Sequence, residues 1–182
     1  MQRTGTATLK VLVPLAALLC GSQAMADNGP YKQVRGWSLY RNETNCSAYM
    51  MFDTNEAVGF TYDAPGRSTR VTFSDARATS LKDGDSPSLD ILLRQPDGTV
   101  DHAWESTVFI VSVDEEGRRT LTSRWLGPPA LDDFMSAAVV GFFDEDREIA
   151  VFSLKGTASA LEEVKDCSMR LSTSNPQDAS AD

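Results

Sequence analysis

Short runs of β-branched and aromatic residues recur along this chain, and each run ends at a turn-forming sequence. Pro65-Gly66 and Asp97-Gly98 are the strongest turn signals, because proline presets one turn angle and glycine accepts the left-handed backbone of a tight hairpin. Short strands that follow one another closely favour antiparallel pairing. We therefore predict strands at residues 34–41, 46–52, 57–63, 68–74, 89–94, 99–106, 108–113, 119–125, 139–143 and 149–154.

Two segments have helical character. Residues 130–137 form a short stretch after Gly-Pro-Pro, and residues 157–166 place Leu161 and Val164 on one face, with Thr157 as the expected N-cap. A chain of many short strands and one C-terminal helix belongs to the mainly β class. We predict an antiparallel β-sandwich or barrel that is capped by the short C-terminal helix.

The chain is long enough for one domain, which we place at residues 27–171. Within it, residues 75–88 are polar and predict an exposed loop. Residues 172–182 contain no candidate core residue after Leu171 and predict a disordered tail.

The first 26 residues have the pattern of a cleavable signal peptide. Arg3 and Lys10 supply a positive start, the apolar run that follows is too short to span a bilayer, and small residues precede a cleavage site before Asp27. Lipidation of Cys20 or a retained anchor are the alternatives. We expect a periplasmic or secreted protein with no integral membrane segment after cleavage.

Acidic residues dominate the charge of the chain, with 26 Asp and Glu against 17 Lys and Arg, for a formal net charge of −9. Removal of Arg3 and Lys10 with the leader makes the remainder still more negative. Nucleic acids and anionic lipid surfaces repel such a protein unless it carries a local basic patch, and the sequence shows none. The charge favours a basic protein as the partner.

Two cysteines, Cys46 and Cys167, remain after the leader. Exported proteins with two cysteines usually pair them, so we predict a disulfide that ties the second strand to the C-terminal helix. Two buried free thiols are the alternative.

Histidine-dependent chemistry has little support, because His102 is the only histidine of the chain. His102 and Ser106 lie too far apart along one strand for a hydrogen bond, and paired cysteines do not ligate zinc. A calcium loop starting at Asp83 fails because Ser88 and Arg94 occupy the positions that require glycine and glutamate. We predict no catalytic residue, metal or cofactor.

The candidate binding residues lie in acidic turns and at two tryptophans. Loops on a rigid sheet often carry binding residues, and aromatic faces stack on ligands. Burial in the core is the alternative for each tryptophan. The candidates are Asp83, Asp85 and Asp90 in one loop, Asp144, Glu145 and Asp146 in one hairpin turn, and Trp104 and Trp125.

The C-terminal part of the chain resembles the invasion-associated locus B family of exported bacterial proteins. The resemblance lies in the strand 139–143, the strand 149–154 that runs into Ser153-Leu154-Lys155-Gly156, and the alanine-bearing segment that follows; Gly36-Trp37 before Cys46 is similar to the opening of that family. The chain departs from the family at Thr157, where an aromatic residue is expected, and in having only two mature cysteines. The resemblance implies a periplasmic or secreted non-enzymatic protein.

These observations favour a non-enzymatic protein-interaction module with an acidic surface, connected with the envelope or with a host. One alternative is a carboxylate-dependent hydrolase that acts on envelope polysaccharide, which requires two carboxylates facing one cleft. A structural envelope protein without a discrete site is the other.

Overall fold

The computed structural model describes residues 29–52, 56–75 and 77–174. The expected leader with Cys20 and Asp27, and residues 175–182 of the expected tail, lie outside these ranges. The elements in chain order are β1 (Lys32–Val34), β2 (Trp37–Arg41), β3 (Cys46–Met51), β4 (Ala57–Asp63), β5 (Ser68–Ser74), β6 (Ser88–Arg94), β7 (Val100–Val113), β8 (Arg119–Ser123), α1 (Pro129–Ser136), β9 (Val139–Asp144), β10 (Arg147–Ser153) and α2 (Thr157–Ser174).

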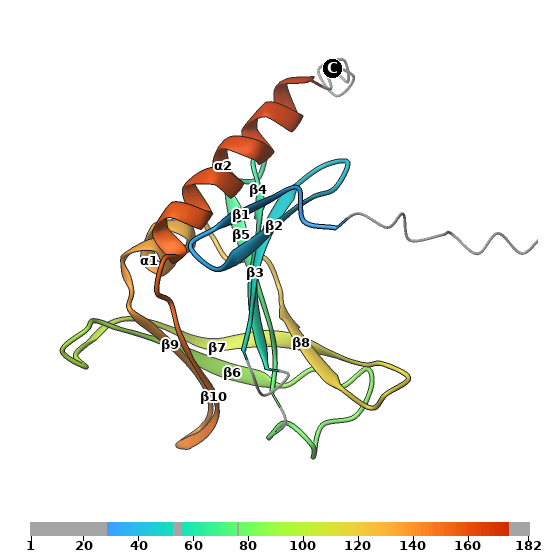
Figure 1. The fold of residues 1–182 in the computed structure, drawn as a ribbon. Helices are drawn as coiled ribbons and strands as arrows, with labels where there is room; N and C mark the ends of the chain where they lie inside the picture. Colours follow the sequence, from blue (N-terminus) through green and yellow to red (C-terminus); the bar gives the residue numbers. More distant parts are fainter. Residues whose placement is uncertain (1–28, 53–55, 76, 175–182) are drawn as a thin grey trace, which may run out of the picture.

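All the strands belong to one antiparallel sheet with the order β1-β2-β3-β4-β5-β8-β7-β6-β9-β10. The mainly β prediction is confirmed, and since β1 and β10 are free edges the sheet is not closed into a barrel. The sheet is folded into two halves that cross at a steep angle (Figure 1). β1 to β5 and β8 make one half, and β6, β9 and β10 make the other.

β7 belongs to both half-sheets. Its first part pairs with β6, and its second part, from Phe109 onward, pairs with β8. The strand bends at Ser106, which has a positive φ of 51°, and the backbone N–H of Ser106 donates to Asp90 Oδ1 at 2.7 Å. The sequence predicts two separate strands here; the carboxylate of Asp90 instead stabilises a bend within one strand.

Aromatic side chains fill the space between the half-sheets. Phe73 of β5 stacks on Phe142 of β9 with their ring centroids 4.0 Å apart, and Phe109 and Phe152 pack around this pair. Each of these rings is almost completely buried. Full burial of one such side chain stabilises a fold by about 1.5–3 kcal/mol, so this cluster is a main reason that the two halves stay together.

α2 covers one end of the first half-sheet, where it packs against β2, β3, β4 and α1 (Figure 1). Leu161 and Val164 of α2 are fully buried, as expected for residues on the apolar face of the helix. The predicted disulfide between Cys46 and Cys167 is confirmed, with a Cα–Cα distance of 6.0 Å. We call α1, α2 and the strand segments that they cover the helix end.

Besides the division of β7 into two strands, four local predictions are wrong. The strand expected at 34–41 is a hairpin of β1 and β2, because Arg35 and Gly36 adopt positive φ angles and turn the chain. Thr157 does not cap α2, since its buried hydroxyl has no hydrogen-bond partner among the described residues. The loop at 75–88 is not wholly exposed, because Asp75 and Ala78 are buried.

The fourth wrong prediction concerns the end of α2. The helix continues beyond residue 166 and through residues 172–174, which the sequence assigned to the tail. Cys167 and Ser168 are buried against the sheet, so the apolar face extends by another turn. None of the described helices is long and apolar enough to cross a membrane.

Candidate functional site

The acidic turn between β9 and β10 projects from the second half-sheet. Asp144 forms an ion pair with Arg147, and Glu145 has a positive φ of 55°. Glu145 and Asp146 are exposed and accept no hydrogen bond from a described residue. The turn therefore presents carboxylates to solvent, as the sequence predicts.

The three carboxylates predicted in the loop before β6 each accept a backbone hydrogen bond. Asp83 Oδ1 accepts from Val113 N–H at 3.0 Å, and Asp85 Oδ2 accepts from Lys82 N–H at 2.7 Å. Asp90 accepts from Ser106, as described above. Asp83 and Asp85 shape the loop, whereas Asp90 lies within β6 and not in the loop, and it holds the bend of β7. The donors to Asp83 and Asp90 lie on β7, so neighbouring residues give no signal for them, whereas the donor to Asp85 lies in the same loop.

The loop and the hairpin turn converge at one end of the molecule. Asp90 pairs with Phe143, the residue before Asp144, so the start of β6 lies beside the β9–β10 turn. Arg77 of the loop also forms an ion pair with Glu148 of β10 at 3.0 Å. We call this region the acidic end and define it by Asp83, Asp85, Asp90, Asp144, Glu145, Asp146 and Glu148.

Ion pairs hold parts of the loops near the acidic end. The guanidinium of Arg77 donates to the buried carboxylate of Asp75, and this hydrogen bond raises the pKa of Arg77 above its usual value. In the neighbouring β7–β8 turn, hydrogen bonds from Arg118, chiefly from its backbone N–H, hold the pKa of Asp114 below its usual value. These hydrogen bonds therefore stabilise the carboxylate form of Asp114 in the β7–β8 turn.

The two candidate tryptophans have different surroundings. Trp104 is half-buried against the core, and its indole N–H donates to Asp133 Oδ2 of α1 at 3.1 Å. Trp125 is 40% exposed, but the guanidinium carbon of Arg70 lies 4.1 Å from its ring centroid. One face of Trp125 is therefore already in contact with a cation.

His102 lies beside the Trp104 contact, with its Nε2 3.6 Å from Asp133 Oδ1 and 3.7 Å from Asp101 Oδ2. The sequence offered no signal for this arrangement, since Asp133 comes from α1. Within the described ranges, no three His, Cys, Asp or Glu side chains are placed to hold a metal ion.

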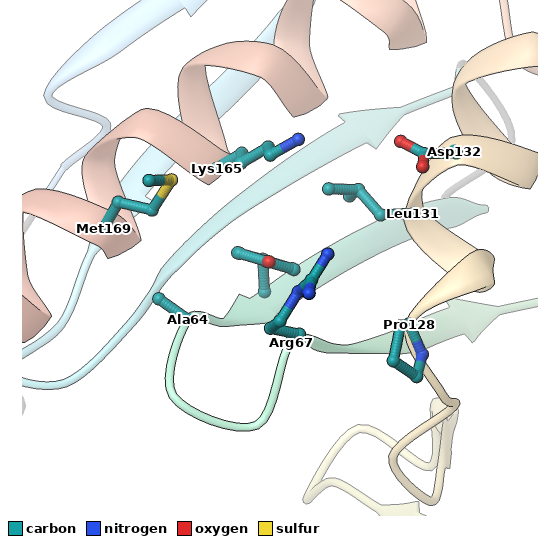
Figure 2. Close-up of a pocket in the computed structure, with 8 residues that line it drawn as sticks. Ala64, Arg67, Pro128, Leu131, Asp132, Lys165 and Met169 are labelled. Carbon is teal, nitrogen blue, oxygen red and sulfur yellow. The ribbon is translucent and has the colours of Figure 1, made fainter.

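A pocket at the helix end was not predicted. It has a volume of about 290 Å³ and lies between α1, α2 and the turn that joins β4 to β5. Figure 2 shows Lys165 extending from α2 toward α1, Asp132 opposite it on α1, and Arg67 reaching from the β4–β5 turn toward the same space. Asp132 is the only carboxylate in the lining, so this pocket lacks the carboxylate pair that the hydrolase alternative needs; that alternative stays a prediction.

Comparisons of the chain with models of protein families, with curated proteins and with solved structures gave no match. The resemblance to the invasion-associated locus B family therefore stays a prediction that rests on the sequence motifs.

Proposed function

We propose that this chain is exported and acts as a protein-interaction module whose acidic end recognises a basic protein. The convergence of two acidic segments at one end of a rigid sheet carries the proposal, because grouped charges of one sign attract an oppositely charged partner and orient it. The Asp144–Asp146 turn supplies the exposed carboxylates, and the loop carboxylates add to the same field.

The proposed location outside the cytoplasm has separate support. Disulfides form and persist in oxidising compartments such as the periplasm and the extracellular space, and Cys46 is bonded to Cys167. The signal-peptide pattern of the first 26 residues agrees with this location. The motifs that resemble the invasion-associated locus B family favour the same compartment.

The test starts with a basic protein recovered by the purified domain from the exported fraction of the native host. Its association rate is measured by surface plasmon resonance at about 0.01 M and about 0.15 M salt, where the Debye length falls from about 30 Å to about 8 Å. We expect association to slow on the order of tenfold, with a smaller change in dissociation. The triple variant D144N/E145Q/D146N should show a similar loss at low salt.

A matched control variant removes an equal number of negative charges, three, at the helix end of the molecule. Glu43, Glu162 and Asp166 are exposed and accept no hydrogen bond from a described residue, so E43Q/E162Q/D166N should leave the association rate within about twofold of the parent. Equal losses in both triple variants would mean that total charge, and not the acidic end, attracts the partner. An association rate that ignores salt would contradict the proposal.

A further inference from the structure

The pocket at the helix end brings together two cations in a protein that is otherwise strongly acidic. Arg67 comes from the β4–β5 turn and Lys165 from α2, nearly a hundred positions later in the sequence. Neither side chain forms an ion pair or donates a side-chain hydrogen bond within the part of the chain that the structure describes. Most Lys and Arg residues of the described ranges also form no ion pair, so Arg67 and Lys165 are distinguished by the single pocket into which both side chains extend (Figure 2).

The turn that carries Arg67 is fixed before any ligand arrives. Arg67 has a positive φ of 46°, a conformation that is unfavourable for a residue with a side chain. Two hydrogen bonds stabilise the turn: Gly66 N–H donates to Asp63 Oδ2 at 2.8 Å, and Arg67 N–H donates to the Ala64 carbonyl at 3.3 Å. The strained backbone therefore aims the Arg67 side chain into the pocket (Figure 2).

The opposite wall is fixed by the attachment of α2 to the sheet. Cys167 and Ser168 lie between the pocket residues Lys165 and Met169 on the helix. Cys167 is bonded to β3, and the Ser168 hydroxyl donates to the Tyr62 carbonyl of β4 at 2.9 Å. Because α2 cannot shift relative to β4, a ligand would lose little free energy in ordering this wall.

The remaining lining is mainly apolar, with one carboxylate. Tyr62, Ala64, Pro128, Leu131 and Met169 supply apolar surface, and Asp132 supplies a hydrogen-bond acceptor on the α1 side. A ligand that matches this pocket needs a negatively charged group for the two cations, an apolar group for the wall and an N–H donor for Asp132. The volume of about 290 Å³ is at the small end for a ligand site, so it suits a molecule of amino-acid size.

We propose that this pocket binds an apolar amino-acid unit through its free α-carboxylate, which lies between Arg67 and Lys165. The apolar side chain of the ligand packs on Leu131 and Met169, and its nitrogen donates to Asp132. A planar guanidinium is well suited to a carboxylate, and a lysine ammonium adds a second charge-assisted hydrogen bond. The proposal does not depend on the acidic end, so either one can fail without the other.

A free amino acid and the C-terminal residue of a peptide share this chemistry, and the experiment separates them. The purified protein with its disulfide intact is titrated by calorimetry with the peptide Ala-Ala-Leu, with its C-terminal amide and with free leucine. We expect the free acid to bind at least about tenfold more tightly than the amide, because the amide has lost the charge that both cations contact. Tighter binding of the peptide than of leucine identifies a peptide end as the ligand, and the reverse order identifies a free amino acid.

Variants of the two cations locate the site. Lys165→Met and Arg67→Gln should each weaken binding of the free acid about tenfold, whereas Arg170→Gln, which removes one charge from α2 outside this pocket, should leave it unchanged. Arg67→Gly is a second variant for the turn, since glycine adopts a φ of 46° without strain and keeps the fold. The proposal is overturned if the amide binds as tightly as the acid, if neither acid binds at about 10 mM, or if Arg170→Gln weakens binding as much as the pocket variants do.

Discussion

At the helix end, α2 is bonded to β3 and covers the sheet, whereas at the acidic end the hairpin turn and the loop project without a helix over them (Figure 1). Side chains at the helix end, such as Leu161, Val164 and Ser168, are completely buried. Those that define the acidic end lie in turns, in the loop or at strand ends, and most of them are exposed to solvent. The difference implies that stability is concentrated at the helix end, while the acidic end can change its charges at little cost to the fold.

The sharpest way to test this contrast is to remove the disulfide. The double variant C46A/C167A frees a loop of 121 residues in the unfolded chain, so the free energy of unfolding should fall by about 2–5 kcal/mol. Urea unfolding followed by circular dichroism measures this change, and a reductant should then cause no further loss in the variant. A loss below about 1 kcal/mol would show that packing alone holds α2.

The second prediction concerns Ser168, whose hydroxyl bridges two strands at the helix end. It accepts from Cys46 N–H at 2.9 Å and donates to the Tyr62 carbonyl at 2.9 Å. Ser168→Ala removes the side-chain partner of both buried backbone groups, and the free energy of unfolding should fall by about 1–3 kcal/mol. Ser172→Ala, on the exposed last turn of α2, is the control and should change it by less than about 0.5 kcal/mol. Equal effects in the two variants would refute the bridging role.

The smallest effect is expected at the acidic end. Asp90→Ala removes the acceptor that holds the bend at Ser106, and because this contact is exposed the loss should be about 1 kcal/mol or less. Asp90→Asn keeps an oxygen acceptor and should recover part of the loss. Asp146→Ala, which removes a charge without a hydrogen bond, should leave urea unfolding unchanged within about 0.5 kcal/mol. If any of these substitutions lowers the free energy of unfolding as much as Ser168→Ala does, stability is not concentrated at the helix end.

The features that could be predicted from the sequence are mainly those that depend on residues close together in the chain. The turns at Pro65-Gly66 and Asp97-Gly98 identify two of the hairpins. Gly98 adopts the positive φ of its turn as expected, whereas in the other turn the positive φ falls on Arg67 and not on Gly66. The disulfide could be predicted because two cysteines allow only one pairing. The acidic turn between β9 and β10 could be predicted because its polar residues follow one another directly in the sequence between two apolar runs.

The features that were missed depend on contacts between distant segments. Nothing near Arg67 in the sequence points to Lys165, since only the docking of α2 beside β4 brings them to one pocket. The continuity of β7 was missed because the signal for its bend is the carboxylate of Asp90, on another strand. Trp104 was recognised as a candidate, but its contact with Asp133 depends on where α1 packs.

The attachment of α2 also decides the order in which the fold can be completed. β2, β3 and β4 are among the first strands of the chain, yet the helix that covers them is its last element. A protein whose contacts join such distant segments folds slowly, because the chain entropy of a long loop is lost before the contacts that close it are gained. The apolar surface of the early hairpins therefore stays open until the C-terminal helix has been synthesised, and only then can Cys46 meet its partner.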